Sequence, residues 1–485
     1  MTRLLVGPFN RVEGDLEVTL EIEDGRVSSA RVNSPMYRGF EQLLQGKRPH
    51  DALVYVPRIC GICSVSQSVA SARALADMGG LSIPPNGQHV TNVILATENI
   101  ADHLTHFYLF FMPDFTRAVY AGRPWHVEAL RRFDPTTGEQ VRQAIAARQR
   151  WFTMLGLLAG KWPHTQSIEP GGSTRAVDSA ERTRLLARIR EFRRFLEQQL
   201  FAAPLEQVLS LANAEDLWDW DARAPLRGDF RMFLAIARDA GLMGLGEGPG
   251  RYLSYGAYPQ PGAAFVFPRG VWRAESSSLG PLDERGIRED ATHAWLADDG
   301  GPRHPCDGLT VPAVDKPGAY TWNKAPRLAG EVVETGAIAR QLAAGHPLVR
   351  DMVEQHGGTV FTRVLARLLE LAQVVPMMEQ WMLALAPGEP YCASGALPDE
   401  GTGIGLSEAA RGSLGHWISV RRGQIENYQI VAPTTWNFSP RDAAGTPGAL
   451  ESALEGAPVH EGETTPVSVQ HIVRSFDPCM VCTVH

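Results

Sequence analysis

The sequence predicts an α+β protein that is predominantly helical, with a core of long helices and peripheral hairpin and strand regions. Two observations carry this prediction. Residues 89–111, 178–200 and 364–385 place apolar side chains mostly at intervals of three or four, as buried helices do. Residues 15–32 instead alternate polar and apolar side chains on both sides of Asp24-Gly25, which predicts a β-hairpin with one buried face.

The helices can be placed one by one. The helix that begins near His89 is expected to end before Pro113, because proline cannot continue it, and its polar members must find partners inside the protein. Asp178 followed by Glu181 is typical of a capping box, so another helix is expected to begin there. One face of that helix is expected to be solvated, and it is formed by Arg184, Arg188, Arg190, Arg193 and Arg194.

The second half of the chain has a less regular pattern. Residues 241–324 are rich in glycine and proline, so strands, turns and partly irregular structure are expected there. Helical spacing returns at 364–385. After Asn437 we expect short helices and polar turns, followed by an apolar stretch at 467–476, and the sequence contains no internal repeat.

Composition excludes several classes of protein. The chain has 485 residues, the length of about three average domains, although a single large domain is also possible. Its content of 44% hydrophobic and 21% charged residues is that of a soluble globular protein. Because 46 Lys and Arg face 54 Asp and Glu, the net charge is −8, and no general attraction to nucleic acid or to an anionic membrane is expected.

The sequence predicts no membrane span. A span needs about 20 consecutive apolar residues, and the nearest candidate, 107–111, is flanked by His103 and Asp114. The first residues, 1–8, are basic and then apolar, but Asn10 follows before a signal-peptide core could form. We therefore expect no export by a signal of this chain.

Four of the six cysteines form two pairs of equal spacing at opposite ends of the chain, Cys60 with Cys63 and Cys479 with Cys482. This spacing lets both thiolates of a pair face one metal. A structural zinc site and two unrelated motifs are alternative interpretations, although a zinc ribbon would keep its pairs within tens of residues of each other. A shared metal would tie both chain ends into one interwoven domain over residues 1–485.

The neighbours of these cysteines extend the pattern. Arg58-Ile59-Cys60-Gly61-Ile62-Cys63 and residues 477–485, DPCMVCTVH, resemble the two signature motifs of the large subunit of nickel-iron hydrogenases, RxCGxC and DPCxxCxxH. Five further segments resemble that family in the same order: 11–14, 37–41, 102–108, 408–416 and 431–437. The resemblance covers nearly the whole chain and implies the nickel-iron hydrogenase large-subunit fold.

The resemblance implies a nickel ion held by all four thiolates. Cys60 and Cys479 would be terminal ligands, whereas Cys63 and Cys482 would bridge to an iron that carries carbon monoxide and cyanide. Soft thiolates suit both metals. The implied reaction is the reversible heterolytic cleavage of dihydrogen, which needs a base near the metals, a route for protons and a route for electrons.

The same resemblance assigns residues around the metals. Arg411 would lie over them and, together with the hydroxyl of Thr434, would donate hydrogen bonds to the cyanide ligands. Asp102 and Asp477 would anchor its guanidinium, because a buried arginine must be paired. The apolar pocket around the diatomic ligands would be formed by Pro433 and Leu414.

Two glutamates also acquire roles by resemblance. Glu13 resembles the family's proton gate, which takes a proton from a cysteine ligand. Glu41 resembles a ligand of magnesium, and His485 with the backbone carbonyl of Ile430 would complete that site. Without the motifs, both glutamates would be interpreted as surface residues. Ordinary buried packing is expected for the remaining candidates, which are His103, His106, His416, Cys306 and Cys392.

The chain departs from the family pattern at several positions. Catalytic members usually have valine and leucine where this chain has Ile62 and Phe110, two larger residues expected to narrow the route of gas to the metals. Gln67 replaces a titratable histidine beside the cofactor, and Ala410 stands where proline is common. The chain stops at His485, whereas most large subunits are made with an extension that a protease removes, and the sequence leaves open whether it shows a processed product.

These departures resemble the regulatory, dihydrogen-sensing hydrogenases, which report the gas to a histidine kinase. We therefore expect a slow, regulatory and cytoplasmic hydrogenase. An energy-conserving uptake hydrogenase is the alternative, and a structural four-cysteine zinc protein is a distant one. Since the sequence has no further cysteine cluster, electrons must leave through a partner, which the resemblance identifies as a small subunit bearing iron–sulfur clusters.

Overall fold

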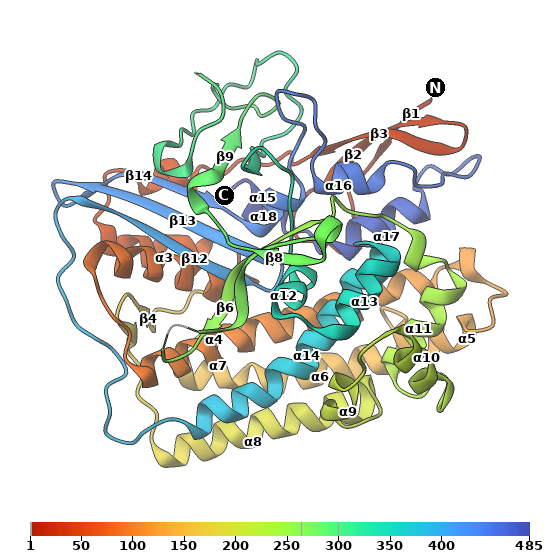
Figure 1. The fold of residues 1–485 in the computed structure, drawn as a ribbon, viewed down its shortest axis with the longest axis horizontal. Coiled ribbons are helices and arrows are strands. Elements are labelled where there is room, and N and C mark those ends of the chain that lie inside the picture. The colour runs from red at the N-terminus through yellow and green to blue at the C-terminus, as the bar shows by residue number, and fades with distance from the viewer. Residues whose placement is uncertain (1, 263, 299) are drawn as a thin grey trace.

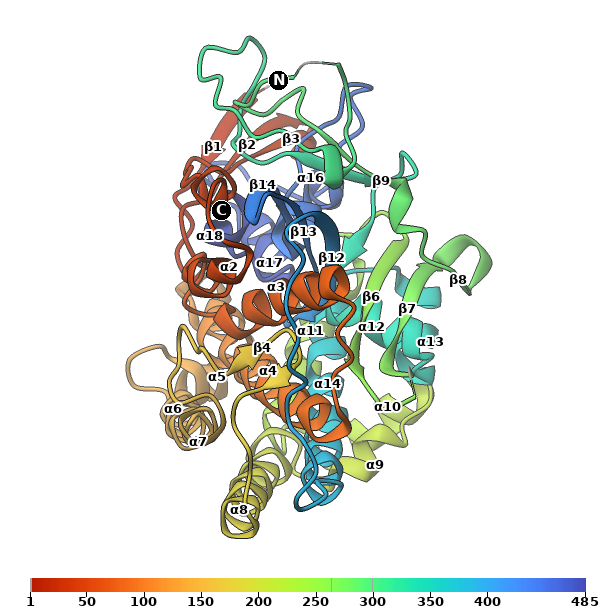
Figure 2. The same cartoon turned by 90° about the vertical axis from the view of Figure 1, so that its left-hand side faces the viewer.

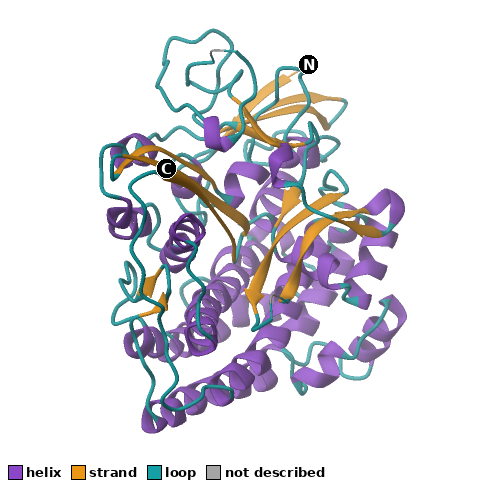
Figure 3. Ribbon diagram, turned by 60° about the vertical axis from the view of Figure 1, so that its left-hand side comes forward, coloured by secondary structure: helices purple, strands orange, loops and turns teal. Residues whose placement is uncertain are grey.

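The computed structural model describes residues 2–262, 264–298 and 300–485 and confirms the predicted α+β class. Helices fill most of one side of the molecule, and the larger sheets lie together on the other side (Figure 3). The helices of the first half are α1 (Phe40–Leu44), α2 (Ala52–Tyr55), α3 (Ser64–Gly79), α4 (Pro85–Thr105), α5 (His126–Phe133), α6 (Glu139–Trp151), α7 (Thr153–Leu158), α8 (Ser179–Phe195), α9 (Leu205–Leu209), α10 (Ala214–Ala222) and α11 (Asp229–Asp239). Those of the second half are α12 (Ala337–Ala344), α13 (Pro347–His356), α14 (Val360–Leu383), α15 (Pro433–Asn437), α16 (Ala449–Leu454), α17 (Val467–Ser475) and α18 (Met480–Thr483).

The strands form small sheets rather than one large one. Two antiparallel sheets have the orders β1-β2-β3 and β12-β13-β14, and a third has the order β11-β6-β7-β8. Two further pairs, β9 with β10 and β4 with β5, complete the set. The strands are β1 (Thr2–Val6), β2 (Glu17–Glu23), β3 (Arg26–Asn33), β4 (Ile168–Glu169), β5 (Gly172–Ser173), β6 (Arg251–Pro259), β7 (Phe265–Arg273), β8 (Ser278–Gly280), β9 (Ile287–Asp290), β10 (Ala325–Leu328), β11 (Glu334–Thr335), β12 (Gly401–Ala409), β13 (Gly412–Arg421) and β14 (Gln424–Val431).

The core is built on three long helices. In Figure 1, α14 runs across the lower half of the molecule, and it packs against α4 and α8. Proline at the start of α4 and a further π-helical turn over His106–Phe111 bound the helix that the sequence predicts to end before Pro113. Almost every side chain of α4 is buried, polar ones included, so its carboxylates and imidazoles require internal partners.

Two glycines let α3 lie against strand β12. A Cβ atom added to Gly403 would lie 2.0 Å from the carbonyl oxygen of Ala74, and one added to Gly405 would lie 1.9 Å from that of Ala70. Both distances are far shorter than van der Waals contact, so only glycine permits this approach. The contact ties the helix that begins after Cys63 to the strand that leads to Arg411.

The two ends of the chain lie in different surroundings. The N-terminal strand β1 projects at one edge of the molecule, whereas the C-terminus lies inward, close to α18 (Figures 1 and 2). His485 is buried accordingly. A short parallel bridge between Glu13 and Cys479 then brings the segment after β1 next to the last helix. The fold therefore delivers both cysteine pairs to one place.

Most predictions about the elements are confirmed. The hairpin is β2–β3, and Asp178 and Glu181 form the capping box of α8. The prediction that Cys306 and Cys392 are small core residues is wrong, because both are exposed. Each lies in a surface connection held by its backbone: the carbonyl of Cys306 accepts a hydrogen bond from Asn427, and Cys392 forms a bridge with Gly172. Within the described part of the chain, no helix combines the length and apolar character needed to cross a bilayer.

Candidate metal centre

The four paired cysteines meet in one place. Cys63 occupies the position that caps the start of α3, and Cys479 occupies the same position before α18, which contains Cys482. Cys60 lies in the turn before Cys63. All four sulfur atoms lie within 4.8 Å of one another, and all four cysteines are free and buried. Two loops from opposite ends of the sequence therefore present four thiols to one point.

The thiols contact one another directly. The Sγ atoms of Cys60 and Cys479 are 3.4 Å apart, those of Cys63 and Cys482 are 2.9 Å apart, and those of Cys479 and Cys482 are 3.1 Å apart. Hydrogen bonds with neighbouring thiols, Cys479 first, lower the pKa of Cys60 and raise that of Cys63, while burial raises the pKa of Cys482. Four thiolates this close together would repel one another, so all four can be ionised only around a bound cation. Four thiolate ligands fit a thiophilic transition metal.

Glu13 reaches the cysteines from the N-terminal segment. Its backbone N–H donates to the carbonyl of Pro478 at 3.4 Å, and the N–H of Met480 donates to the carbonyl of Glu13 at 2.7 Å. The side chain is half-buried, and burial followed by the charge of Cys60 raises the pKa of Glu13. This carboxyl group can therefore hold a proton at a higher pH than an exposed glutamate does.

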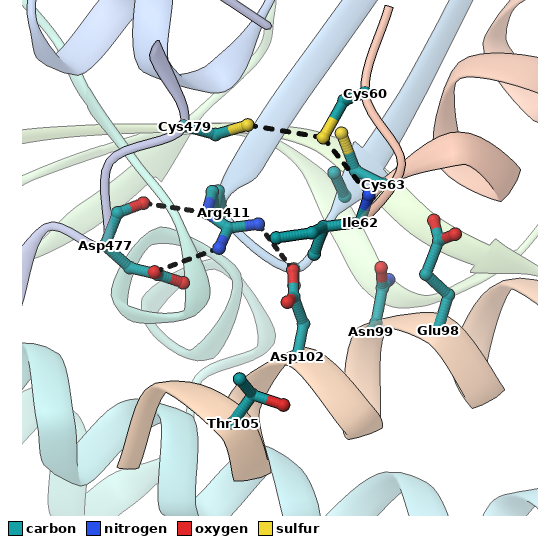
Figure 4. Close-up of polar contacts among 12 residues, drawn as sticks. Cys60, Ile62, Cys63, Glu98, Asn99, Asp102, Thr105, Arg411, Asp477 and Cys479 are labelled. Carbon is teal, nitrogen blue, oxygen red and sulfur yellow. Dashed lines mark hydrogen bonds and ion pairs between the residues drawn. The ribbon is translucent and has the colours of Figure 1, made fainter. Parts of the chain in front are cut away.

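Arg411 lies in the turn between β12 and β13, where its guanidinium is held between Asp102 and Asp477 (Figure 4). Nη1 donates to Asp102 Oδ2 at 2.6 Å, Nη2 to Asp477 Oδ1 at 3.1 Å, and Nε to the backbone carbonyl of Asp477 at 2.9 Å. The arginine is 3% exposed. Three bonds to two segments fix both the position and the plane of the cation, as lysine could not.

The two carboxylates that share this guanidinium differ in the direction in which their pKa is shifted. Burial raises the pKa of Asp102 to about 8, because Arg411 offsets it only in part. At Asp477 burial acts in the same direction, but Arg411 and His106 outweigh it and lower the pKa. Burial therefore shifts the pKa of Asp102 upward, whereas the neighbouring cations shift that of Asp477 downward.

Two other predicted cofactor neighbours, Thr434 and Gln67, contact the cysteines. The Oγ1 of Thr434 accepts a hydrogen bond from the backbone N–H of Cys479 at 3.1 Å, so its own proton remains available to another acceptor. Gln67 is fully buried, with Oε1 2.8 Å from His416 Nε2 and Nε2 3.9 Å from the sulfur of Cys482. Pro433 and Leu414, predicted to wall the pocket, are both buried.

Glu41 and His485 lie in a second buried polar pocket. His485 Nε2 is 3.1 Å from Glu41 Oε1, which also accepts from the backbone N–H of Ile430 at 2.8 Å. The Nζ of Lys324 is 3.6 Å from Glu41 and 3.4 Å from Glu289. Burial would raise the pKa of Glu41, but Lys324 and His485 lower it to about 2. The carboxylates of Glu41 and Glu289 outweigh the single charge of Lys324, so the pocket is negative. Its oxygen atoms and the imidazole of His485 are donors that fit a hard divalent cation.

The two bulky residues occupy different surroundings. Ile62 is partly buried, and its backbone N–H donates to the sulfur of Cys60 at 3.3 Å (Figure 4). Phe110 is half-buried in the π-helical turn that follows α4. The histidines expected to pack in the interior are buried, with bonds from His103 to Glu370, from His106 to the carbonyl of Arg474, and from His416 to Tyr428.

Sequence reasoning missed three buried charged residues near these sites. Glu98 lies one turn before Asp102 on α4 and accepts from the backbone N–H groups of Val65 and Ser66, at 2.8 and 2.9 Å. Arg340 contacts the segment before Arg411, and Lys324 contacts Glu41. The four-residue spacing from Asp102 was an available signal for Glu98, whereas the other two have partners far away in the sequence.

Comparison with known proteins agrees with this geometry. The family described as nickel-dependent hydrogenase matches residues 38–124 and 226–485. The periplasmic [NiFeSe] hydrogenase large subunit of Desulfomicrobium baculatum is 28% identical, over 100% of this chain and 95% of its own length. The hydrogenase-2 large chain of Escherichia coli K12 is also 28% identical, and the uptake hydrogenase large subunit of Rubrivivax gelatinosus is 26% identical.

Solved structures extend the likeness to the fold. The Ni-Fe-Se hydrogenase from D. vulgaris Hildenborough in the reduced state has a TM-score of 0.84 and 30% sequence identity, with 100% of both chains covered. Its match spans both chain ends, where the two cysteine pairs lie. On the family match and this likeness over the full length, the chain belongs to the nickel-dependent hydrogenases.

Proposed function

We propose that the chain is the large, catalytic subunit of a nickel-iron hydrogenase that oxidises dihydrogen, and that residues 1–485 act as one domain around the metal centre. The observation that carries this proposal is the group of four free, buried thiols within 4.8 Å of one another, supplied by both ends of the chain. When bound, a nickel-iron centre supplies the metals at which dihydrogen is split heterolytically. Cys60 and Cys479 would hold nickel alone, and Cys63 and Cys482 would bridge to iron.

The surrounding residues then have separate tasks. Arg411, fixed by Asp102 and Asp477, keeps a cation and directed N–H donors over the centre, which favours developing negative charge there. Glu13 accepts the proton delivered by a cysteine sulfur, since its raised pKa suits a relay. The hydroxyl of Thr434 would donate to a diatomic ligand on iron, and the buried apolar side chains of Pro433 and Leu414 would keep water away from that ligand.

The test is to change one ligand and one exposed cysteine as its control. Cys479→Ser should remove nickel from the purified protein, because a serine hydroxyl is a harder and less easily ionised ligand than a thiolate. Cys392→Ser should retain equal amounts of nickel and iron, together with the infrared bands of carbon monoxide and cyanide. Zinc in place of nickel in the active wild-type protein would refute the proposal and would instead support the structural zinc interpretation.

We also place a magnesium ion in the pocket around Glu41. The carboxylate of Glu41, the imidazole of His485 and the carbonyl of Ile430 would be its ligands from the protein. Glu289 and Lys324 lie beside these ligands. Together with Glu41, their side chains carry one net negative charge. Removal of the ion with a chelator should lower the thermal stability of the wild-type protein more than that of Glu41→Gln, because the variant has already lost a ligand.

A partner must carry the electrons away. Among the residues that the structure describes, the four cysteines are the one group found in which three or more cysteine, histidine or carboxylate side chains lie close enough together to share a metal. Several relatives are named as large subunits or large chains, which implies a smaller partner. We propose that this partner is a small subunit bearing iron–sulfur clusters, and that it determines where the enzyme resides.

Two physiological roles use the same chemistry. The named relatives include uptake and periplasmic enzymes, and they favour an energy-conserving uptake hydrogenase. The second candidate is a cytoplasmic regulatory hydrogenase that signals dihydrogen to a histidine kinase. It is favoured by Ile62, Phe110 and Gln67, and particularly by the position of Ile62 beside the cysteines.

The double variant Ile62→Val with Phe110→Leu separates the two candidates. If the bulky pair excludes larger gases, the variant should lose dihydrogen oxidation in the presence of dioxygen while keeping it under anaerobic conditions, because packed interiors do not fully close such voids. A thermal melt of the variant controls for general loss of stability. Unchanged tolerance to dioxygen in a well-folded variant would favour the uptake enzyme over the sensor.

A further inference from the structure

Arg340, in the middle of α12, uses every hydrogen-bond donor of its guanidinium, and it is fully buried. Nε and one Nη2 proton bind the carboxylate of Glu370 at 3.0 and 2.9 Å. Nη1 donates to Glu408 Oε2 at 2.7 Å and to the carbonyl of Ala409 at 2.8 Å, and Nη2 donates to the carbonyl of Ala410 at 2.9 Å. A guanidinium has five N–H groups, so none is left unused.

Three of these five contacts fall on consecutive residues that lead directly to Arg411. Glu408 and Ala409 end strand β12, Ala410 opens the turn, and Arg411 follows it. The other side of the turn is fixed as well. Gly412 has φ +132°, and a Cβ atom added there would lie 2.4 Å from Thr335 Oγ1 and 2.6 Å from the backbone nitrogen of Gly336. The turn is therefore pressed against the start of α12, the helix that carries Arg340.

We infer that Arg340 is a positioning residue for Arg411: it clamps the β12–β13 turn through the carbonyls of Ala409 and Ala410, so that the guanidinium of Arg411 is presented at a fixed place over the four cysteines. This inference rests on the proposed function, in which Arg411 acts at the metal centre. Arg340 does not touch the cysteines, and it acts only through the backbone of the turn.

The clamp supplies stiffness that the sequence of the turn lacks. Alanine at 410 has more backbone freedom than the proline common in the family at this place, and a two-residue turn has few bonds of its own. Arg340 is in turn held by Glu370, which also contacts His103 at 3.1 Å. A planar guanidinium anchored at two points on one carboxylate can reach two carbonyls and a second carboxylate simultaneously, whereas a lysine ammonium has three donors from one atom.

The structure offers a matched control in Arg327. Its buried guanidinium is used in the same way, with donors to Asp442 at 2.9 Å, to Ser439 at 3.2 Å, and to carbonyls of Pro326, Pro440 and Thr446 at 3.0 to 3.2 Å. It ties down a loop after α15 rather than the turn of Arg411. Arg340→Lys and Arg327→Lys therefore each break a clamp of five hydrogen bonds, and only the clamp of Arg340 holds the turn of Arg411.

The experiment measures the holoprotein with its partner subunit in four forms: wild type, Arg340→Lys, Arg327→Lys, and Arg340→Lys combined with Arg411→Lys. We expect Arg340→Lys to retain nickel and iron but to lose turnover by about 10- to 100-fold, as small misplacements of a site residue do. Amide hydrogen exchange over 409–412 should accelerate in Arg340→Lys and stay unchanged in Arg327→Lys. The double variant should turn over no more slowly than Arg411→Lys alone, because the clamp acts only through Arg411.

Distinct outcomes separate failure of the inference from failure of the proposed function. Absence of nickel from the wild-type protein refutes the function itself. Near-normal turnover in a metal-loaded Arg340→Lys, or losses that multiply in the double variant, refutes the positioning role. If Arg340→Lys does not accumulate in folded form, Glu370→Gln loosens the same clamp by removing its anchoring charge, and it must show the same faster exchange over 409–412 for the inference to stand.

Discussion

Arginines of this chain occupy two contrasting regions. In the centre, Arg340, Arg363 and Arg411 are at most 3% exposed and are held in place by carboxylates and carbonyls of several segments. On helix α8, Arg188 and Arg190 have side chains 44% and 54% exposed, and each pairs with a glutamate at the surface. The residue type is the same, but the surroundings decide what it contributes.

The difference has a physical basis. A buried cation is tolerated only when its full hydrogen-bonding capacity is matched, so removal of one partner leaves an unpaired charge at a cost of about 3 to 5 kcal/mol. A surface pair is screened by water and contributes about 0 to 1 kcal/mol. Buried arginines can therefore fix geometry for chemistry, whereas those of α8 mainly keep the helix solvated. The following predictions test this contrast.

The largest effect is expected at Arg411. Arg411→Lys keeps the charge but loses the fork that joins Asp102 and Asp477, so dihydrogen turnover should fall by at least about a hundredfold while the metals are retained. Turnover with an artificial electron acceptor, beside nickel and iron content, measures this directly. Near-normal turnover in a metal-loaded variant would place Arg411 with the structural arginines instead.

Acid should remove the contribution of Glu370 to the stability of the centre. Burial alone would raise the pKa of Glu370, but Arg340 and His103 lower it to about 2. An unfolded chain then binds more protons than the folded one between pH 4.5 and 2, so stability is fully present above about pH 4.5 and is lost as the pH falls, by about 3 kcal/mol in the limit. The thermal midpoint should decline from pH 5 to 3, and Glu370→Gln should flatten that decline. An equal decline in both proteins would contradict the assignment.

The sequence predicts the features that depend on nearby residues, but it does not predict the buried arginine and lysine contacts of the centre. The hairpin β2–β3, the capping box of α8 and its solvated face follow from spacing within a few residues, which local physics determines. The four cysteines were found as candidate metal ligands from their spacing, whereas Arg411 was found only because it lies in a motif that resembles a known family. Arg340 and Lys324 have no such motif, and their partners are set by tertiary packing, so no local pattern identifies them.

The wrong prediction for Cys306 and Cys392 has a similar cause. Cysteine is among the most buried residue types on average, and this average predicted a core position for Cys306 and Cys392. Both lie in surface loops whose paths depend on contacts of the backbone, which side-chain propensities do not encode. A statistical preference therefore failed where no periodic pattern supported it.

A smaller effect than that of acid is expected at Glu98, whose buried carboxyl group caps α3 from a neighbouring helix. Cys63 occupies the capping position but makes no such bond, because its thiol faces the other cysteines, and Glu98 binds the N–H groups of Val65 and Ser66 instead. Trp162 Nε1 donates to it as well, at 2.9 Å. Glu98→Ala should cost about 2 kcal/mol through the lost cap and the unmatched donors, and it should loosen metal retention at Cys63. Glu191→Ala on α8 is the control, and an equal shift in thermal midpoint would contradict the capping role.

The smallest effect is expected on α8 itself. Arg188→Ala removes a pair with Glu191 at 2.7 Å that lies one turn along an exposed helix, so the free energy of unfolding should change by about 0.5 kcal/mol or less, and turnover should not change. The buried counterpart is Arg363→Ala, which breaks a two-point contact with Glu334 at 2.7 and 2.9 Å and should cost about 3 kcal/mol or more. Thermal melts of both variants in low and high salt measure the contrast, because only the exposed pair is screened by salt. A loss at Arg188 as large as that at Arg363 would mean that the arginine face of α8 is covered by another surface in the assembled protein.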